Sequence, residues 1–245
     1  MDSKLRVHIA TVDHHIERIT EPLINLRADK AYIVTYGQKD AAVEFLKKTE
    51  KILKKHRISY KVVFVDLWNL MACVQKFRDL ILQEDGNQIF FNVSTGTKIS
   101  AISAMLSCMI WNCQPYYAKP DYSDRRVPRE IAVEEIKEIV SMPIYKMNSP
   151  KTEHLQILQI LQQHDGKIKK RNLIEELKNQ NTIKSVDLQE LSKPAEYGQL
   201  KTILDPMIKL EYVDVKVIGR NNIVSITPQG ENTLEIFGDK NWKLE

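Results

Sequence analysis

Cysteine is scarce in this sequence, and its distribution excludes two kinds of scaffold. Cys73, Cys108 and Cys113 are the three cysteines in 245 residues. An odd, scattered set fits neither a disulfide framework nor the paired spacing of a zinc site. We therefore expect three core cysteines, a cytoplasmic protein, and no metal or cofactor.

Long apolar segments are absent as well. Every apolar run is far shorter than the roughly 20 residues that a transmembrane helix needs. In the first residues, MDSKLRVHIATVDHH, an apolar stretch is interrupted by Arg6, His8 and Asp13, which predicts a first strand and no signal peptide. We expect no association with membranes.

The common motifs of catalysis are also missing. There is no Walker A spacing, no dinucleotide fingerprint, and no Ser-His-Asp or metal-ligand pattern. A phosphodiesterase that uses a ribose 2′-hydroxyl as nucleophile would need only anion stabilisation and a positioned acid or base. Slow, metal-independent catalysis therefore stays open, with no residue assigned as catalytic. Candidate acid–base groups near the predicted strand ends are Asp13, His14, His15, Glu17, Asp66 and Lys98.

The C-terminal part lacks an excess of positive charge. The whole chain carries a net charge of +4, but from Pro150 onward 14 Lys and Arg face 14 Asp and Glu. If this part binds nucleic acid, it must therefore do so through a local basic patch.

Up to about residue 140, strand-like and helix-like segments alternate. Apolar stripes such as Ile99, Ile102, Met105, Leu106 and Met109 predict helices between the strands. This alternation predicts a Rossmann-like α/β domain with a doubly wound, mostly parallel sheet of five or six strands. The strand-like runs are residues 5–12, 31–36, 60–66, 88–93 and 114–118.

A hinge-like segment, residues 142–150, separates this domain (residues 1–141) from a second one (residues 151–245). The second pattern is a helix at 151–163, a turn and a second helix, a third helix at 195–209, and two strands at 212–218 and 223–227. Pro206 is expected to bend or shorten the third helix. This order predicts an α+β winged helix-turn-helix domain.

Residues 92–98, NVSTGTK, follow a predicted strand and precede a predicted helix. Gly96 lets the backbone approach a ligand closely, and Thr97 can cap the helix. The free N–H groups of that helix and Lys98 together favour an anion. From the residues alone, simple capping and phosphate binding stay equally open.

Residues 11–18, TVDHHIER, follow the first strand. Asp13 can cap the first helix, which would place His14 and His15 in its first turn. Adjacent residues do not share a helix face, so we expect no metal site. The first and fourth strands are neighbours at the switch point of such a sheet, so this segment is expected beside Ser94–Lys98.

Basic residues cluster at two places in the second domain. Lys167, Lys169, Lys170 and Arg171 precede or begin its second helix, and Arg220 lies in the hairpin turn. They suit contacts with DNA phosphates and the minor groove; the alternative is a solvated helix face, since Glu175 and Glu176 follow. Candidates for reading bases from the third helix are Lys193, Glu196, Tyr197, Gln199 and Lys201.

The NVSTGTK turn in a Rossmann-like domain that precedes a winged helix resembles the CARF family, the CRISPR-associated Rossmann-fold regulators. The resemblance is closest to their archaeal transcriptional regulators. It implies a homodimer that binds a cyclic oligoadenylate, commonly the four-adenine ring, in antiviral defence. Ser94, Thr95, Gly96, Thr97 and Lys98 would contact ribose-phosphate. Thr11, Asp13 and His14 would line the adjacent wall. Thr95 stands where the family usually has a second glycine.

The sequence thus predicts a dimeric transcriptional regulator that senses a cyclic oligoadenylate and binds double-stranded DNA. The first alternative is a ring nuclease that cleaves the cyclic ligand in the N-terminal pocket. The second is an interaction protein whose winged helix packs against protein partners.

Overall fold

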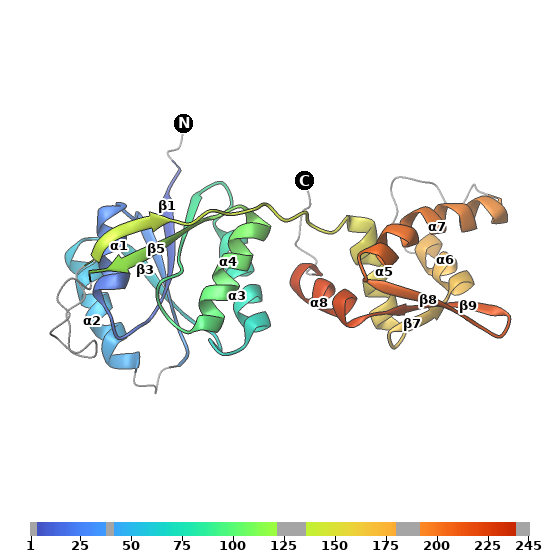
Figure 1. Cartoon of the computed structure of the whole chain (residues 1–245), viewed down its shortest axis with the longest axis horizontal. Helices are drawn as coiled ribbons and strands as arrows, with labels where there is room; N and C mark the ends of the chain where they lie inside the picture. Colours follow the sequence, from blue (N-terminus) through green and yellow to red (C-terminus); the bar gives the residue numbers. More distant parts are fainter. Residues whose placement is uncertain (1–3, 38–41, 122–135, 180–191, 239–245) are drawn as a thin grey trace. The chain divides into compact units, whose positions relative to one another are not determined.

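The computed structural model describes residues 4–37, 42–121, 136–179 and 192–238. The chain divides into two compact units, Met1–Asn148 and Ser149–Glu245 (Figure 1). Each unit has its own hydrophobic core and is described by itself.

The first unit is built on a six-stranded sheet with the strand order β3-β2-β1-β4-β5-β6. The first five strands pair in parallel, and β6 pairs antiparallel to β5. This confirms the predicted mostly parallel, doubly wound sheet, including the predicted neighbours β1 and β4. The strands are β1 (Arg6–Thr11), β2 (Lys30–Thr35), β3 (Ser59–Phe64), β4 (Gln88–Asn92), β5 (Gln114–Pro120) and β6 (Ile136–Ser141).

Helices cover both faces of this sheet. Helices α1 (Glu17–Asn25) and α2 (Ala42–Lys55) lie on one face, and α3 (Leu70–Gln83) and α4 (Lys98–Trp111) lie side by side on the other (Figure 1). Successive strand residues point to opposite faces, so Ile9 packs in the α3–α4 layer and Ala10 in the α1–α2 layer. All three cysteines are buried, as predicted.

Helix α4 is oriented differently from what its apolar stripe suggests. Its buried residues are mostly small or polar, and among the larger ones Ile102 is 49% exposed while Met105, Leu106 and Met109 are only partly buried. Small side chains let α4 pack closely on α3 and the sheet. Met105 packs against the core, whereas Ile102 faces outward. The buried residues of α4 are Ser100, Ser103, Ala104, Ser107, Cys108 and Ile110.

The second unit is a winged helix domain. A three-stranded antiparallel sheet of order β7-β9-β8 packs with the helices around one apolar cluster that includes Leu158, Leu173, Leu204 and Val224. Its elements in chain order are α5 (Thr152–Gln163), β7 (Lys167–Lys169), α6 (Lys170–Asn179), α7 (Lys193–Lys209), β8 (Val213–Ile218), β9 (Asn221–Ile226) and α8 (Pro228–Phe237).

Two details of this unit differ from the sequence-based expectation. Residues Lys167–Lys169 form a short strand that pairs with β9, so they do not begin the second helix. Pro206 does not shorten α7, which continues to Lys209. A proline lacks only its own N–H, so this helix keeps its other hydrogen bonds and its packing through Leu204 and Met207.

Candidate functional site

Two loops meet at the carboxyl ends of β1 and β4. These strands pair in parallel, with Ile9 beside Phe91, so the segments that follow them emerge at the same sheet edge. The N–H of Gly96 donates a hydrogen bond to Asp13 Oδ2 at 3.0 Å. The two motifs singled out in the sequence are thus joined directly at the switch point, where such sheets bind ligands.

Asp13 does not cap the first helix, contrary to expectation. Helix α1 begins at Glu17 after Ile16, with no side-chain cap. Asp13 instead uses its other oxygen to accept the N–H of His15 and to contact His14 Nδ1 at 2.6 Å. His14 and His15 therefore precede α1. The Asp13 carboxylate also occupies one backbone donor, that of Gly96, which a phosphate in the predicted turn would otherwise use.

Gly96 is required by the shape of this turn. Its φ is +83°, and a Cβ at this position would lie 2.5 Å from Thr11 Cγ2 and 2.7 Å from Ser100 Oγ. Thr11 is buried beneath the turn. The side chain of Thr11 therefore packs against the backbone of Gly96.

Thr97 has the predicted capping role and a second one. Its Oγ1 accepts the N–H of Ser100 at 3.0 Å and donates to the carbonyl of Leu67, which follows β3, at 2.6 Å. The first N–H groups of a helix have no partner within the helix. With Ser100 capped, the N–H groups of Lys98 and Ile99 are the helical donors that point to the carboxyl edge of the sheet.

Ser94 is hydrogen-bonded within the protein, and Thr95 is buried. Ser94 donates its N–H and its hydroxyl to Asn92 Oδ1, and Asn92 Nδ2 donates to the carbonyl of Arg18 at 2.7 Å. Thr95 is only 2% exposed. The Thr95 side chain therefore points into the protein, away from the surface of the turn.

A cavity of about 320 Å³ opens between these loops. Of the eight predicted ligand residues, Asp13, His14, Gly96 and Thr97 line it, while Thr11, Ser94, Thr95 and Lys98 do not. Lys98 is exposed in the first turn of α4. The remaining lining residues are Val12, Thr35, Tyr36, Ala42, Phe45, Leu67 and Trp68.

Sequence reasoning missed the aromatic part of this cavity. Tyr36 follows β2, Trp68 follows β3, and Phe45 lies on α2. Tyr36 ends the predicted strand at 31–36, and Trp68 lies two residues after the predicted strand at 60–66, on the edge where ligands bind. Their position was therefore a usable signal, although they belong to no recognised motif.

A basic surface lies on β7 and the start of α6. Lys167 and Lys169 are exposed on either side of buried Ile168, because side chains alternate along a strand. Arg171 is 79% exposed and pairs with Glu175 one helical turn later. The alternative of a solvated, partly neutralised helix face therefore applies to Arg171, but not to the two strand lysines.

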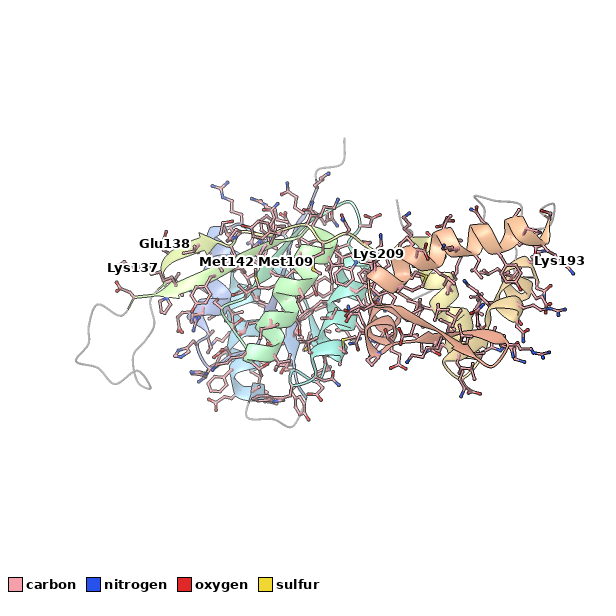
Figure 2. All side chains as sticks on the ribbon, turned by 45° about the vertical axis from the view of Figure 1, so that its right-hand side comes forward. Met109, Lys137, Glu138, Met142, Lys193 and Lys209 are labelled. Carbon is pink, nitrogen blue, oxygen red and sulfur yellow. The ribbon has the colours of Figure 1, made fainter. Side chains whose placement is uncertain are left out.

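Helix α7 presents one exposed polar face. Lys193, Tyr197 and Lys201 are exposed and spaced four residues apart, so they share a side of the helix. Gln199 is half-buried and lies on a different side. Figure 2 shows Lys193 and Lys209 at the two ends of this helix.

Glu196 was expected to be available to bases, but it is 8% exposed and paired with Lys178 on α6. A buried carboxylate needs a charged partner. Glu196 therefore fastens α7 to α6.

The β8–β9 hairpin forms the wing. Its strands extend to Ile218 and Asn221, so the turn consists of Gly219 and Arg220. Gly219 has a φ of +63°, which suits glycine in a tight turn. Arg220 is exposed at the tip, and Lys216 is 74% exposed on β8.

The described part of the chain contains neither a metal-binding cluster nor a membrane-spanning helix. No group of three or more His, Cys, Asp or Glu side chains there is placed to hold a metal ion. None of its helices is both long and apolar enough to cross a bilayer.

Together these features define the class of protein. A doubly wound sheet with a cavity at its switch point is followed by a winged helix domain. Residues 6–123 match the family model described as HFX_2341_N-like, N-terminal, and residues 153–238 match that of the DUF6293 C-terminal winged helix domain. The chain thus combines a Rossmann-like α/β domain with a C-terminal winged helix domain, which confirms the predicted domain types.

Among curated proteins, the chain is similar to the uncharacterized protein MJ1513 of Methanocaldococcus jannaschii. The two are 32% identical over 129 residues, which cover 48% of this chain and 38% of MJ1513. The match thus spans well under half of that relative's length.

Among solved structures, protein VC1899 from Vibrio cholerae overlaps 94% of this chain and 64% of its own, with 13% identity and a TM-score of 0.43. Can2 from Sulfobacillus thermosulfidooxidans, solved with cyclic tetra-adenylate, overlaps 95% and 64%, with 13% identity and a TM-score of 0.39. Csm6 from Enterococcus italicus overlaps 84% and 56%, with 10% identity and a TM-score of 0.45. Likenesses this weak do not bear on the ligand or activity of this chain.

Proposed function

We propose that this protein is a dimeric transcriptional regulator that senses a cyclic oligoadenylate and binds double-stranded DNA. The observation that carries the proposal is the cavity at the β1–β4 switch point, in a chain that also has a winged helix. Helix α4 directs the N–H groups of Lys98 and Ile99 to that edge, and Lys98 adds a positive charge. A helix N-terminus with a neighbouring cation favours phosphate.

The size of the cavity supports two copies per ligand. At about 320 Å³, it lies at the lower end of the range for small-molecule pockets, roughly 300–1,000 Å³. A four-nucleotide ring needs more room than one such cavity. A two-fold symmetric ring can engage identical groups from two protomers around a shared axis.

The outer face of α4 is the surface that we assign to the second copy. It presents the exposed Ile102 with the partly buried Leu106 and Met109, and α4 begins at the same turn that borders the cavity. Pairing through this face would therefore bring the two turns near each other. An exposed apolar helix face beside a ligand site is typical of an interface.

The winged helix supplies the DNA-binding half of the proposal. Lys193, Tyr197 and Lys201 on α7 suit the major groove, and Arg220 on the wing suits the adjacent groove. Lys167, Lys169 and Lys170 suit backbone phosphates. Because this unit has no net positive charge, each module binds weakly, and a dimer gains affinity by joining two half-sites.

A thermal-shift screen of the full chain against cyclic oligoadenylates of several sizes and common mononucleotides tests the sensor. We expect stabilisation by one cyclic oligoadenylate. Lys98→Ala should weaken its binding in calorimetry without changing the melting temperature of the free protein, and Lys54→Ala on α2 is the matched control. Unchanged affinity of Lys98→Ala would overturn the assignment of the phosphate site.

A ring nuclease is the second candidate, and the Asp13–His14 pair favours it. Asp13 contacts His14 Nδ1 at 2.6 Å, which leaves Nε2 of this cavity-lining residue available as a base. In such a reaction the ribose 2′-oxygen attacks phosphorus and loses its proton to the base. The 5′-oxygen leaves as a protonated hydroxyl, and a 2′,3′-cyclic phosphate remains. Intact labelled cyclic tetra-adenylate after hours with the protein would exclude this activity.

A further inference from the structure

Two large aromatic side chains are exposed on the wall of the switch-point cavity. Trp68 is 71% exposed and Tyr36 is 52% exposed, although side chains of this size usually bury most of their surface. They follow the neighbouring parallel strands β3 and β2, in which Phe64 pairs with Thr35. The shared sheet edge therefore places both aromatics on one side of the cavity.

The backbone that carries Trp68 is held in place on both sides. Its own N–H donates to Asp66 Oδ1 at 3.0 Å, and Asn69 caps α3 by accepting the N–H of Ala72. The carbonyl of Leu67 accepts the hydroxyl of Thr97. Leu67, the residue before Trp68, is thus joined by a hydrogen bond to the turn to which we assign the phosphate.

We propose that Trp68 and Tyr36 form a stacking platform for a nucleobase of the bound ligand. This inference rests on the proposed sensor function and adds the part of the site that reads the ligand's base. The cavity lining combines the turn residues Gly96 and Thr97 with the aromatic residues Tyr36 and Trp68, as a ligand with a phosphate and a flat ring requires. Aromatic side chains bind bases through their π faces, and each such contact contributes about 5- to 150-fold in affinity.

Titration of the full-length protein with cyclic tetra-adenylate, AMP, CMP and the base-free probe ribose 5-phosphate tests the platform. Trp68→Ala should bind the base-containing probes about 5- to 150-fold more weakly, and Trp68→Phe should keep most of the affinity. Ribose 5-phosphate should bind both variants like the original protein. Tyr145→Ala, which removes an aromatic that is 80% exposed away from the cavity lining, is the matched control.

Fluorescence gives a second readout, because stacking on a base should quench Trp68. The chain has three tryptophans, so the quench should vanish in Trp68→Phe and persist in Trp111→Phe. Equal binding of cyclic tetra-adenylate to Trp68→Ala would overturn the platform and leave the sensor function intact. If AMP binds in a Trp68-dependent way but no cyclic oligoadenylate binds, the platform is supported and the proposed ligand is overturned. No binding of any probe would overturn both.

A separate observation concerns Gly198, in the interior of α7. A Cβ at Gly198 would meet no atom within 4 Å, whereas at Gly230 in α8 it would lie 2.1 Å from the carbonyl oxygen of Tyr212. Packing therefore explains Gly230 but not Gly198. Glycine weakens a helix interior relative to alanine. Gly198 also follows Tyr197 directly on the exposed side of α7.

We infer that Gly198 lets the backbone of α7 approach DNA closely, an inference that rests on the proposed DNA binding. Gly198→Ala should raise the melting temperature by a few degrees and weaken binding to labelled duplexes from upstream of its own gene by tenfold or more. Gly37→Ala, at a glycine with equally open surroundings, should leave DNA affinity unchanged. Equal or tighter binding by Gly198→Ala would overturn this role alone. Absence of DNA binding by the original protein would overturn the DNA-binding proposal together with it.

Discussion

At the scale of single residues, His8 shows how burial creates a pH dependence. It is fully buried on β1, stacks on Phe90 with ring centroids 4.7 Å apart, and its Nδ1 lies 3.3 Å from the hydroxyl of Tyr116. Burial and the nearby charge of Arg6 lower the pKa of His8 from 6.5 to about 4, against a smaller opposing effect of Asp29. The folded protein therefore holds this ring neutral where the unfolded chain is protonated.

The free energy of unfolding should consequently fall as the pH drops from about 6.5 to about 4, by up to about 3 kcal/mol from this group. Above pH 6.5 both states are neutral, so the contribution is complete and constant there. Denaturant titrations of the full chain across this range measure the effect. His8→Gln should flatten the profile, and His154→Gln controls for the second histidine with a lowered pKa. An unchanged slope in His8→Gln would show that another group is responsible.

Gly96 is the second residue whose surroundings permit a sharp prediction. Gly96→Ala forces a Cβ against Thr11 and strains a backbone at a φ of +83°. We expect a loss of about 1–3 kcal/mol of stability together with loss of nucleotide binding, since the turn must shift away from Asp13. Chemical denaturation and calorimetry check both effects, with Gly37→Ala as the control for glycine loss. Wild-type stability in Gly96→Ala would contradict the packing described for this turn.

At the scale of elements, helix α4 supplies the surface through which we propose that two copies of the protein form a dimer. Ile102→Glu places a charge on its outer apolar face, where Ile102 is already 49% exposed. The free protomer should lose little stability, because surface substitutions usually change it by less than about 0.5 kcal/mol. The dimer should dissociate, which light scattering after size exclusion can measure. Leu82→Glu, at a leucine 38% exposed on α3, should leave the dimer intact; equal behaviour of the two variants would disprove the interface.

At the scale of the whole molecule, the proposal requires a coupling between the two ligands. If a cyclic oligoadenylate and DNA each bind one dimer geometry better than the other, each ligand changes the affinity for the other by the same factor. We expect a factor of roughly 5 to 150. Dissociation constants for DNA with and without cyclic tetra-adenylate, and the reverse pair, measure it at fixed salt concentration, because phosphate contacts are salt-dependent. If neither ligand changes the dissociation constant of the other, ligand sensing and DNA binding are not coupled.

Much of this protein could be predicted from the sequence by itself. Alternating apolar strands and helical stripes predicted a mostly parallel sheet, because both backbone periods are local properties. The same holds for the cap at Thr97, which depends on a few neighbouring residues. The place of the site followed from topology, since parallel strands end at one edge.

Other features were decided only by the tertiary structure. The local pattern of α4 does not say which side faces the sheet, and close packing on α3 selected the small residues. Asp13 accepts a hydrogen bond from Gly96, 83 residues away, and does not cap the nearby helix α1. Glu196 is buried and forms an ion pair with Lys178. The side chain of Thr95 is buried as well. In each case the outcome depended on which distant groups share a space, and this is set when the elements pack together.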